Sequence, residues 1–453
     1  MLGFDYELRR QGFAGNSCQI VLELSTAIKV ARLEQRLADL AEQHPILRSQ
    51  PGRGLNLMPR WKPTRARPRV RVHEAAGDMP QRLFNEPLHI HRGELMRFDL
   101  IERTMIFTWA HALMDAKSAE YFLALVGGDG VPVPEAGKDW YAERMTGGLR
   151  ALARQAWQEI ERLDQFRKAL PVSLATHRGP VETGQVVGQA SRLSHRASRP
   201  RWWLRGRDAL LTGGTPAPLP DLPEQLRPVT RTLKYQVVAL GPDDSARVRA
   251  QASRLCGFLG DTTFHLAATL LELHQLHERI GYASASYVVP IPVGLRPKGT
   301  RAPLFSNQVT TMLHQFLPEQ LGSLEQAVAA VKNKNSEYLR DEHINPGIAL
   351  GQMFRWLPMP LYMRMIKHEL RGEICSLFFG DTASVDPALK DFLGAGIEKF
   401  AHVPAVTMPP GAGVVFYRFR DQLQFTLVHA DGTLTDHEAA DFAGRLRARL
   451  INA

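Results

Sequence analysis

A run of strand-forming residues stops at Trp109 and is followed at once by a helix-forming segment with a histidine and an aspartate four positions apart. Residues 105–109 are β-branched and aromatic, whereas residues 110–125 hold helix formers with apolar residues at helical spacing. The pattern predicts a strand-to-helix turn with His111 and Asp115 on one helix face. A neutral imidazole at such a strand end can take a proton from a hydroxyl or an amine, so His111 is the candidate general base.

The spacing of this pair is weak evidence by itself. A chain with sixteen histidines contains roughly one chance His-x-x-x-Asp. The same spacing recurs at His437 and Asp441, inside an amphipathic segment near the C-terminus, where a solvated helix face is the favoured interpretation. The sequence around His111 must therefore support its assignment.

That surrounding sequence, residues 83–125, resembles the core of the condensation-domain superfamily of acyltransferases, which also includes chloramphenicol acetyltransferase and the wax ester synthases. The family signature is His-His-x-x-x-Asp-Gly, and its second histidine matches His111. The C-terminal pattern of a strand pair and a closing helix also fits. Three further segments resemble family elements in the same order: 33–48 (a helix ending in His-x-x-Leu-Arg), 289–297 (the Pro-Val-Asn-x-Arg strand) and 304–316 (the Gly-Asn strand).

The sequence departs from the family signature at three positions. Ala110 replaces the first histidine, Ala116 replaces the terminal glycine, and Gly294 replaces the asparagine of Pro-Val-Asn. Glycine permits a close backbone approach that a methyl group can obstruct, so Ala116 either narrows the acceptor channel or is tolerated.

The resemblance also implies a partner for the aspartate of the motif. Asp115 is expected to pair with an arginine that holds the shape of the loop, with Arg296 as the first choice and Arg48 as the second. A buried carboxylate needs such a partner, because an unpaired charge in a protein interior is very costly.

A chain of 453 residues is too long for one compact core. The resemblance implies an α/β fold class with two chloramphenicol-acetyltransferase-like lobes, each of two α+β layers, that form a V with the active-site tunnel between them. We assign residues 1–170 to the N-terminal lobe with the His-x-x-x-Asp motif and residues 231–453 to the C-terminal lobe. Residues 171–230 are rich in Gly, Pro, Ser and Arg, which indicates a crossover or lid.

Regular elements follow from the local patterns along both lobes. We predict helices at 31–44, 142–168, 243–254, 261–279, 323–340 and 359–371. We predict strands at 17–24, 69–73, within 95–109, and at 232–240, 285–293 and 306–316, followed by the closing strand pair and helix.

The three cysteines, at 18, 256 and 375, are far apart and form no Cys-x-x-Cys pair, so neither a disulfide nor a structural zinc site is expected. The histidines between 265 and 277 also lack the spacing of a metal site. The chain has neither a signal-peptide-like start nor about eighteen uninterrupted apolar residues. We therefore expect a cytoplasmic protein, peripheral at a membrane at most, without a metal.

The net charge of +10 is concentrated in two basic stretches, 48–71 and 192–207. A role in solubility alone accounts for such basic stretches as well as a functional role does. The functional alternatives are docking of an acidic acyl carrier protein, contact with coenzyme A phosphates, or contact with an anionic membrane. Trp202 and Trp203 suit an interfacial segment, although packing of the crossover onto a lobe is favoured. Nucleic acid is not an expected partner, because no base-reading motif accompanies the charge.

The expected activity is transfer of an acyl group from a pantetheine thioester to a hydroxyl or amine acceptor, with His111 as general base and without an acyl-enzyme. Coenzyme A or a carrier-protein arm would be a co-substrate, and no cofactor is expected. The oxyanion would be bound by backbone N–H groups near His111 or by the amide of Asn307, which could equally be a satisfied strand-end amide. The alternative, suggested by Ala110 and Ala116, is a catalytically silent docking module.

Overall fold

In the computed structural model of the protein, most of both halves of the chain is described. The proposed crossover lies outside the described residues except for residues 171 and 173–175, and so do the Trp202–Trp203 pair and the second basic stretch. The described residues are 1–54, 58–134, 139–144, 148–169, 171, 173–175, 231–257, 260–282, 284–297, 299–340, 344–369 and 373–452.

The first lobe is built on a sheet with the strand order β11-β12-β1-β6-β5-β4. Aromatic and aliphatic residues of its central strands pack under two helices, α2 (Val30–Gln43) and α4 (Ala116–Gly127), for example through the rings of Phe107 and Phe122. A short helix, α3 (Met79–Phe84), covers the opposite face. The strands are β1 (Ser17–Leu24), β4 (Arg69–His73), β5 (Met96–Ile101), β6 (Thr104–Ala110), β11 (Asp391–Phe392) and β12 (Ala395–Val403).

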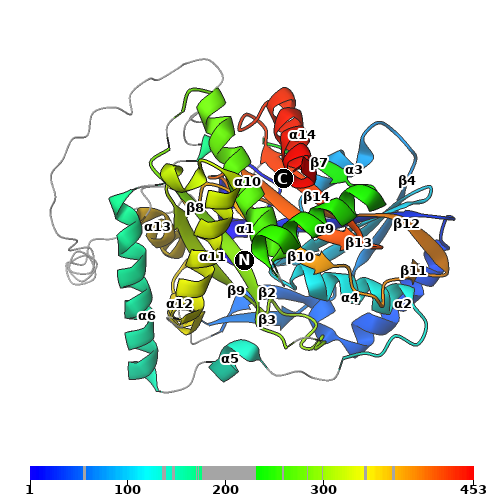
Figure 1. Ribbon diagram of the computed structural model, residues 1–453. Coiled ribbons are helices and arrows are strands. Elements are labelled where there is room, and N and C mark those ends of the chain that lie inside the picture. Colours follow the sequence, from blue (N-terminus) through cyan, green and yellow to red (C-terminus); the bar gives the residue numbers. More distant parts are fainter. Residues whose placement is uncertain are drawn as a thin grey trace, which may run out of the picture.

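The second lobe is built on a sheet with the order β10-β13-β14-β7, in which β10 runs parallel to β13. Its helices pack together over this sheet, where their apolar residues form a second core (Figure 1). The strands are β7 (Leu233–Ala239), β10 (Phe378–Ser384), β13 (Ala412–Phe419) and β14 (Gln422–Ala430). The helices are α9 (Pro242–Cys256), α10 (Asp261–Arg279), α11 (Leu324–Arg340) and α14 (Asp436–Asn452).

A two-stranded ribbon and a group of outer helices complete the described structure. The ribbon pairs β8 (Tyr287–Gly294) with β9 (Val309–Phe316). The helices α6, α12 and α13 lie together at the left of Figure 1, with α1 against α13. These and the remaining elements are α1 (Leu2–Arg10), α5 (Trp140–Arg144), α6 (Leu149–Asp164), α12 (Ile344–Phe354), α13 (Met359–Glu369), the hairpin β2 (Ser49–Arg53) and β3 (Pro59–Pro63), and the short 3-10 turns 45–48, 90–92, 165–168 and 318–321.

The second half of the chain contributes two strands, β11 and β12, to the first sheet. β12 comes from the second half but pairs antiparallel with β1 in the first sheet, with Ile20 opposite His402. The chain crosses between the sheets in the short connection from β10 to β12, through β11, so it joins the lobes next to the motif helix α4. The lobe boundaries at 170 and 230 stay predictions, because the residues between them are largely outside the described part of the chain.

Most of the regular elements predicted from the sequence are present. The expected helix at 142–168 is divided into α5, α6 and a 3-10 turn, and the expected strands within 95–109 are β5 and β6. The elements missed from the sequence are α1, α3, α12, the β2–β3 hairpin and the strands β10, β11 and β12. No helix among the described residues is long and apolar enough to cross a membrane.

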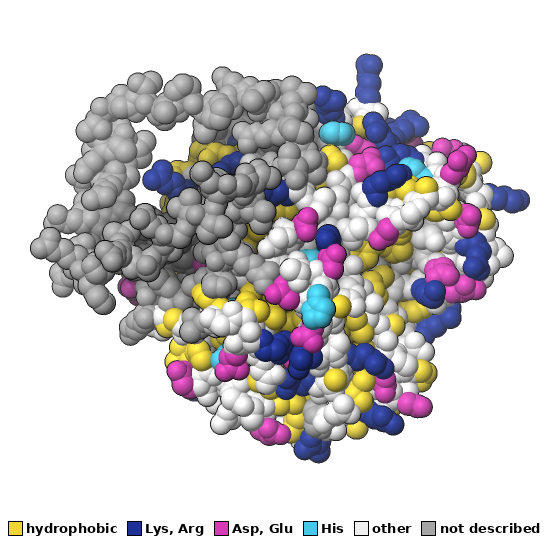
Figure 2. Space-filling model, turned by 90° about the horizontal axis from the view of Figure 1, so that it is seen from above, with side chains coloured by type: hydrophobic (Ala, Val, Ile, Leu, Met, Phe, Trp, Pro, Cys, Tyr) yellow, Lys and Arg dark blue, Asp and Glu magenta, His cyan; other side chains and the backbone are white. Residues whose placement is uncertain are grey.

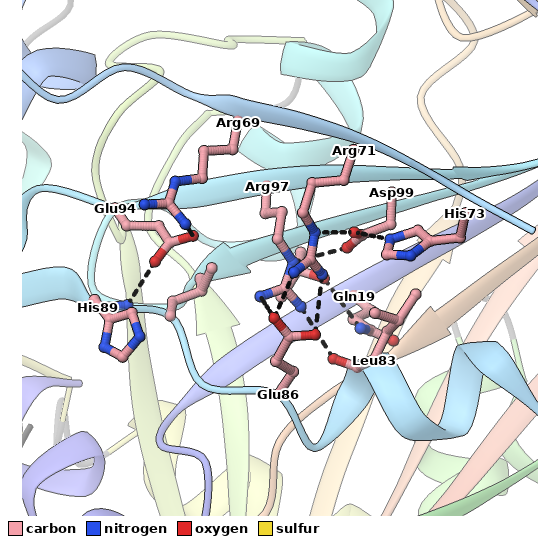
Figure 3. A network of polar contacts seen from close by, with 12 residues as sticks. Gln19, Arg69, Arg71, His73, Leu83, Glu86, His89, Glu94, Arg97 and Asp99 are labelled. Atoms are coloured by element: carbon pink, nitrogen blue, oxygen red, sulfur yellow. Dashed lines mark hydrogen bonds and ion pairs between the residues drawn. The ribbon is translucent and has the colours of Figure 1, made fainter. Parts of the chain in front are cut away.

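The first basic stretch runs through the β2–β3 hairpin and ends in the edge strand β4, and acidic side chains pair with several of its cations. Figure 3 shows the buried Asp99 carboxylate between Arg71, Arg97 and His73. On the described part of the face in Figure 2, cationic and acidic side chains are interspersed. Further pairs of this stretch are Arg48 and Arg67 with Glu42, Arg69 with Glu94, and Arg71 with Glu86.

Candidate active site

The motif begins where β6 ends. After Ala110 the chain makes a turn through residues 111–113, and α4 begins only at Ala116. Asp115 is the N-cap of α4: its backbone is extended (φ −78°, ψ 173°) and its Oδ1 accepts a hydrogen bond from the Ser118 N–H at 2.9 Å. A carboxylate at this position satisfies a backbone N–H that has no partner within the helix.

This capping corrects one sequence prediction. His111 and Asp115 do not share a helix face, because the helix starts after both of them. An aspartate side chain readily accepts a hydrogen bond from a nearby backbone N–H. Aspartate is therefore favoured at the N-cap and disfavoured inside a helix. The pair is instead held by a turn whose shape depends on contacts from elsewhere in the chain.

Asp115 forms the predicted ion pair with Arg296. The Arg296 guanidinium donates to Asp115 Oδ2 over 2.6 Å, and the backbone N–H of Gln308 donates to the same oxygen over 3.0 Å. Arg296 also donates to the hydroxyl of Ser118 at 2.8 Å and to the carbonyls of Pro303 and Ser306 at 2.8 and 3.1 Å.

The surroundings make this a buried pair. The Asp115 side chain is 5% exposed and that of Arg296 is 11% exposed. Arg48, the second choice of partner, lies elsewhere and pairs with Glu42 over 3.0 Å. Arg296 therefore connects the start of α4 to the segment between β8 and β9.

Asn307 holds the turn from the other side. Its Nδ2 donates to the carbonyl of His111 at 2.8 Å and to that of Ala112 at 3.3 Å, while the backbone N–H of His111 donates to the Asn16 carbonyl at 3.0 Å. The Asn307 amide is thus engaged by two carbonyls of the turn. Of the two roles considered for Asn307, these contacts fit structural support rather than binding of an oxyanion.

The His111 side chain has the properties required of a base. Burial lowers its pKa from the usual value, against the opposing effect of the nearby Asp115 carboxylate, so the ring is neutral at pH 7. Its Nδ1 is buried and has no hydrogen-bond partner among the described residues. A neutral imidazole can accept a proton.

His111 lines a cavity of about 2220 Å³ between the two lobes. The first lobe contributes Trp109 and the N-terminal turn of α4, and the second lobe contributes the β8–β9 ribbon and β10. Asp115, Ala116 and Arg296 also line it. The methyl group of Ala116 therefore leaves His111 in contact with the cavity.

A thiol in the same cavity is poorly suited to nucleophilic catalysis. Cys18 lines the cavity, but burial raises the pKa of its thiol to about 12. A thiol with such a pKa has almost no thiolate at neutral pH. Among the described residues there is no group of three or more His, Cys, Asp or Glu side chains arranged to hold a metal ion.

A second histidine in the cavity wall was missed by sequence analysis. His402 on β12 contacts the buried carboxylate of Glu120 at 2.9 Å, and Glu120 also accepts from Lys117 Nζ and from the backbone N–H of Asp386. These contacts tie α4 to the chain segment that crosses between the sheets. No sequence signal indicated them, because residues 120 and 402 are brought together only by the β1–β12 pairing.

Comparisons with known proteins show the fold. No family model matches the sequence, and no curated protein matches it. Among solved structures, the chain is similar to the first condensation domain of the CDA synthetase, with 14% identity, a TM-score of 0.64, and coverage of 98% of this chain and 93% of that one.

Two further solved structures are similar over nearly the whole chain. The trichothecene 15-O-acetyltransferase TRI3 from Fusarium sporotrichioides has 13% identity and a TM-score of 0.61, with 99% of this chain and 92% of that one covered. Polyketide synthase associated protein 5 from Mycobacterium tuberculosis has 14% identity and a TM-score of 0.58, with 98% and 96% covered. The described chain thus has the two-lobed α/β fold of condensation domains and chloramphenicol-acetyltransferase-like acyltransferases, as predicted.

Proposed function

We propose that this protein is an acyltransferase that moves an acyl group from a pantetheine thioester to a hydroxyl or amine acceptor, with His111 as general base. The observation that carries the proposal is the position of His111: a neutral imidazole in the wall of a large cavity between two lobes, on a turn fixed by Asp115, Arg296 and Asn307. The fold adds support, because a structural neighbour is named as an acetyltransferase and others as condensation domains.

The proposed reaction needs one base and no covalent intermediate. The neutral ring of His111 removes the proton from the acceptor as its oxygen or nitrogen forms a bond to the thioester carbonyl carbon. The carbon–sulfur bond then breaks, and the imidazolium returns the proton to the departing thiolate. Positioned acid–base catalysis of this kind contributes roughly 100- to 10,000-fold, and the rest of the rate comes from holding both substrates in line.

The tetrahedral intermediate requires hydrogen-bond donors for its negative oxygen. Because the amide of Asn307 is occupied by the His111 and Ala112 carbonyls, we assign this role to backbone N–H groups. Ala116 and Lys117 form the first turn of α4 and line the cavity. The first N–H groups of a helix have no partner within it, so these two are the candidate donors.

The donor would be carried by coenzyme A or by an acyl carrier protein, both of which present a pantetheine arm and negative charge. The net charge of +10 favours either partner. We expect a cytoplasmic location, and the same charge favours contact with an anionic membrane surface.

A silent docking module is the second candidate function, and the replacements Ala110 and Ala116 favour it. A module without activity has no need to keep the base accessible. His111 lines the cavity beside Ala116, and this supports the enzyme over the docking module.

The test is release of free thiol from purified protein offered acyl-coenzyme A and acyl carrier protein donors with pooled alcohols and amines. The proposal expects acceptor-dependent thiol release and, by mass spectrometry, unacylated protein throughout. If no combination releases thiol while the protein still binds a carrier protein, the docking module is the better account. Accumulation of an acylated protein would overturn the mechanism with a single base.

A further inference from the structure

One part of the cavity is lined by apolar side chains that the proposed chemistry does not use. They come from α6, α12 and α13, which lie together at the left of Figure 1, away from α4. We call this part the aliphatic branch. The residues that define it are Ile160, Leu163, Leu350, Phe354, Tyr362 and Ile366.

The β8–β9 ribbon leads from the acid–base site into the aliphatic branch. One face of the ribbon packs into the core of the second lobe, for example through Val289 and Met312. The residues of the opposite face line the cavity as three successive cross-strand pairs: Gly294 with Val309, Pro292 with Thr311, and Pro290 with Leu313.

The first of these pairs adjoins the acid–base site, because Arg296 and Gln308, which bind Asp115, follow and precede it in the chain. Antiparallel strands rise about 3.4 Å per residue, so the ribbon covers about 14 Å between Gly294 and Pro290. The cavity wall therefore continues from the reacting centre along the ribbon to the apolar helices.

The polar groups along the aliphatic branch are few. Glu159 lines the cavity there, but its carboxylate is bound by Arg162, and Arg364 on α13 also lines the cavity but is exposed. A peptide acceptor placed in this branch would lose the water that solvates its amides and gain few hydrogen-bond partners in return, which disfavours its binding. A hydrocarbon chain has no such groups to satisfy.

Apolar residues are also exposed where the branch approaches the surface. Leu361 on α13 lines the cavity and is exposed, and Met353 and Trp356, eight and five positions before it in the chain, are exposed too. An exposed apolar side chain at the mouth of a cavity can contact an apolar ligand. This rim provides a path for a hydrocarbon into the branch.

We propose that the aliphatic branch binds a long unbranched hydrocarbon chain of one substrate while the reactive carbonyl or hydroxyl of that substrate lies at His111. This inference rests on the proposed function and names its substrate class. The cavity of about 2220 Å³ exceeds an ordinary ligand pocket of roughly 300–1,000 Å³, so it can hold a chain together with a pantetheine arm. Each buried methylene raises affinity by roughly fourfold.

The chain offers a matched pair of variants. Gly351 lies on α12 and lines the cavity, and a Cβ built on it meets no atom within 4 Å. Gly444 lies on α14, is exposed, and also has open space around such a Cβ. Gly351 is also exposed, so Gly351→Trp should narrow the mouth of the branch, whereas Gly444→Trp makes the same change in a helix away from the cavity.

The experiment measures binding by calorimetry and transfer by thiol release. Dodecanoyl-coenzyme A with ethanol tests a chain on the donor, and acetyl-coenzyme A with dodecan-1-ol tests a chain on the acceptor. In one of these arms, the wild type should bind the twelve-carbon compound at least roughly a hundredfold more tightly than its two-carbon analogue. Gly351→Trp should reduce this preference at least tenfold, and Gly444→Trp should leave it unchanged.

Equal binding of short and long compounds in both arms, or equal preference in the two tryptophan variants, would overturn the inference. Failure of the proposed function gives a different result: binding that depends on chain length and on Gly351, but no thiol release. Conversely, transfer of acetyl groups to ethanol at the same rate in all three proteins, without a chain-length preference, would support the acyltransferase and contradict the aliphatic branch.

Discussion

Arg296 Nη1 lies 2.6 Å from Asp115 Oδ2, although 181 positions separate the two residues in the chain. Asp115 caps the helix that follows His111, and Arg296 lies just beyond β8 of the ribbon. Their ion pair therefore connects the turn that carries the proposed base to the cavity wall of the other lobe.

Arg296→Met is expected to lower the free energy of unfolding by about 3–5 kcal/mol, because it leaves the buried Asp115 carboxylate without its cation. Urea denaturation measures the change. Arg445→Met is the control, since Arg445 forms an exposed pair with Asp441 whose loss should cost about 0.5 kcal/mol or less. Similar losses in the two variants would show that the buried pair does not hold the lobes as described.

Asn307→Ala is expected to impair catalysis more than folding. Loss of its hydrogen bonds to the His111 and Ala112 carbonyls should cost about 1 kcal/mol of stability. The turn would then be free to shift, and a small displacement of a catalytic group lowers kcat/KM by at least roughly tenfold. Steady-state kinetics beside urea denaturation separate the two effects; unchanged kcat/KM with the expected loss of stability would contradict the positioning role.

The pH dependence follows from the lowered pKa of His111. The neutral ring is the active form, so kcat/KM should be constant near pH 7 and fall only as pH drops through a pKa below the usual value of about 6.5. A pH–rate profile with an acceptor alcohol, which does not itself titrate in this range, measures that pKa. An acidic limb centred above 6.5 would mean that burial does not govern the ring.

The same shift has a consequence for stability. The unfolded chain binds a proton at His111 more readily than the folded chain does, so this residue makes stability fall as pH drops below the unfolded value, and its contribution is fully present above that value. The acid loss of activity and the acid loss of stability therefore have the same direction and must be measured separately.

The sequence was sufficient to predict the local elements and the ion pair between Asp115 and Arg296. The alternation in residues 17–24 and the helical spacing in 261–279 are local patterns, and both elements are present. Arg296 was identified as the partner of Asp115 through the family resemblance, and the two side chains form an ion pair. Burial of one carboxylate made a cationic partner necessary.

Long-range features could not be predicted in this way. Nothing local in residues 395–403 indicates that they pair with β1 rather than with their neighbours in the chain, so the place of His402 beside Glu120 was missed. The start of the helix was predicted too early, because the alanine and leucine residues before Asp115 favour a helix. In the structure the helix begins only after Asp115, whose side chain caps it by accepting a hydrogen bond from Ser118. The hydrogen bond from the Gln308 backbone depends on tertiary packing alone.

The central claim is that His111 is the base for acyl transfer. The most direct test compares kcat/KM for acceptor-dependent thiol release by the wild type and by His111→Ala at pH 7.5, with the most productive donor and acceptor and with folding of both proteins verified by urea denaturation. The account predicts a loss of roughly 100- to 10,000-fold in the variant. Equal kcat/KM in the two proteins would contradict it.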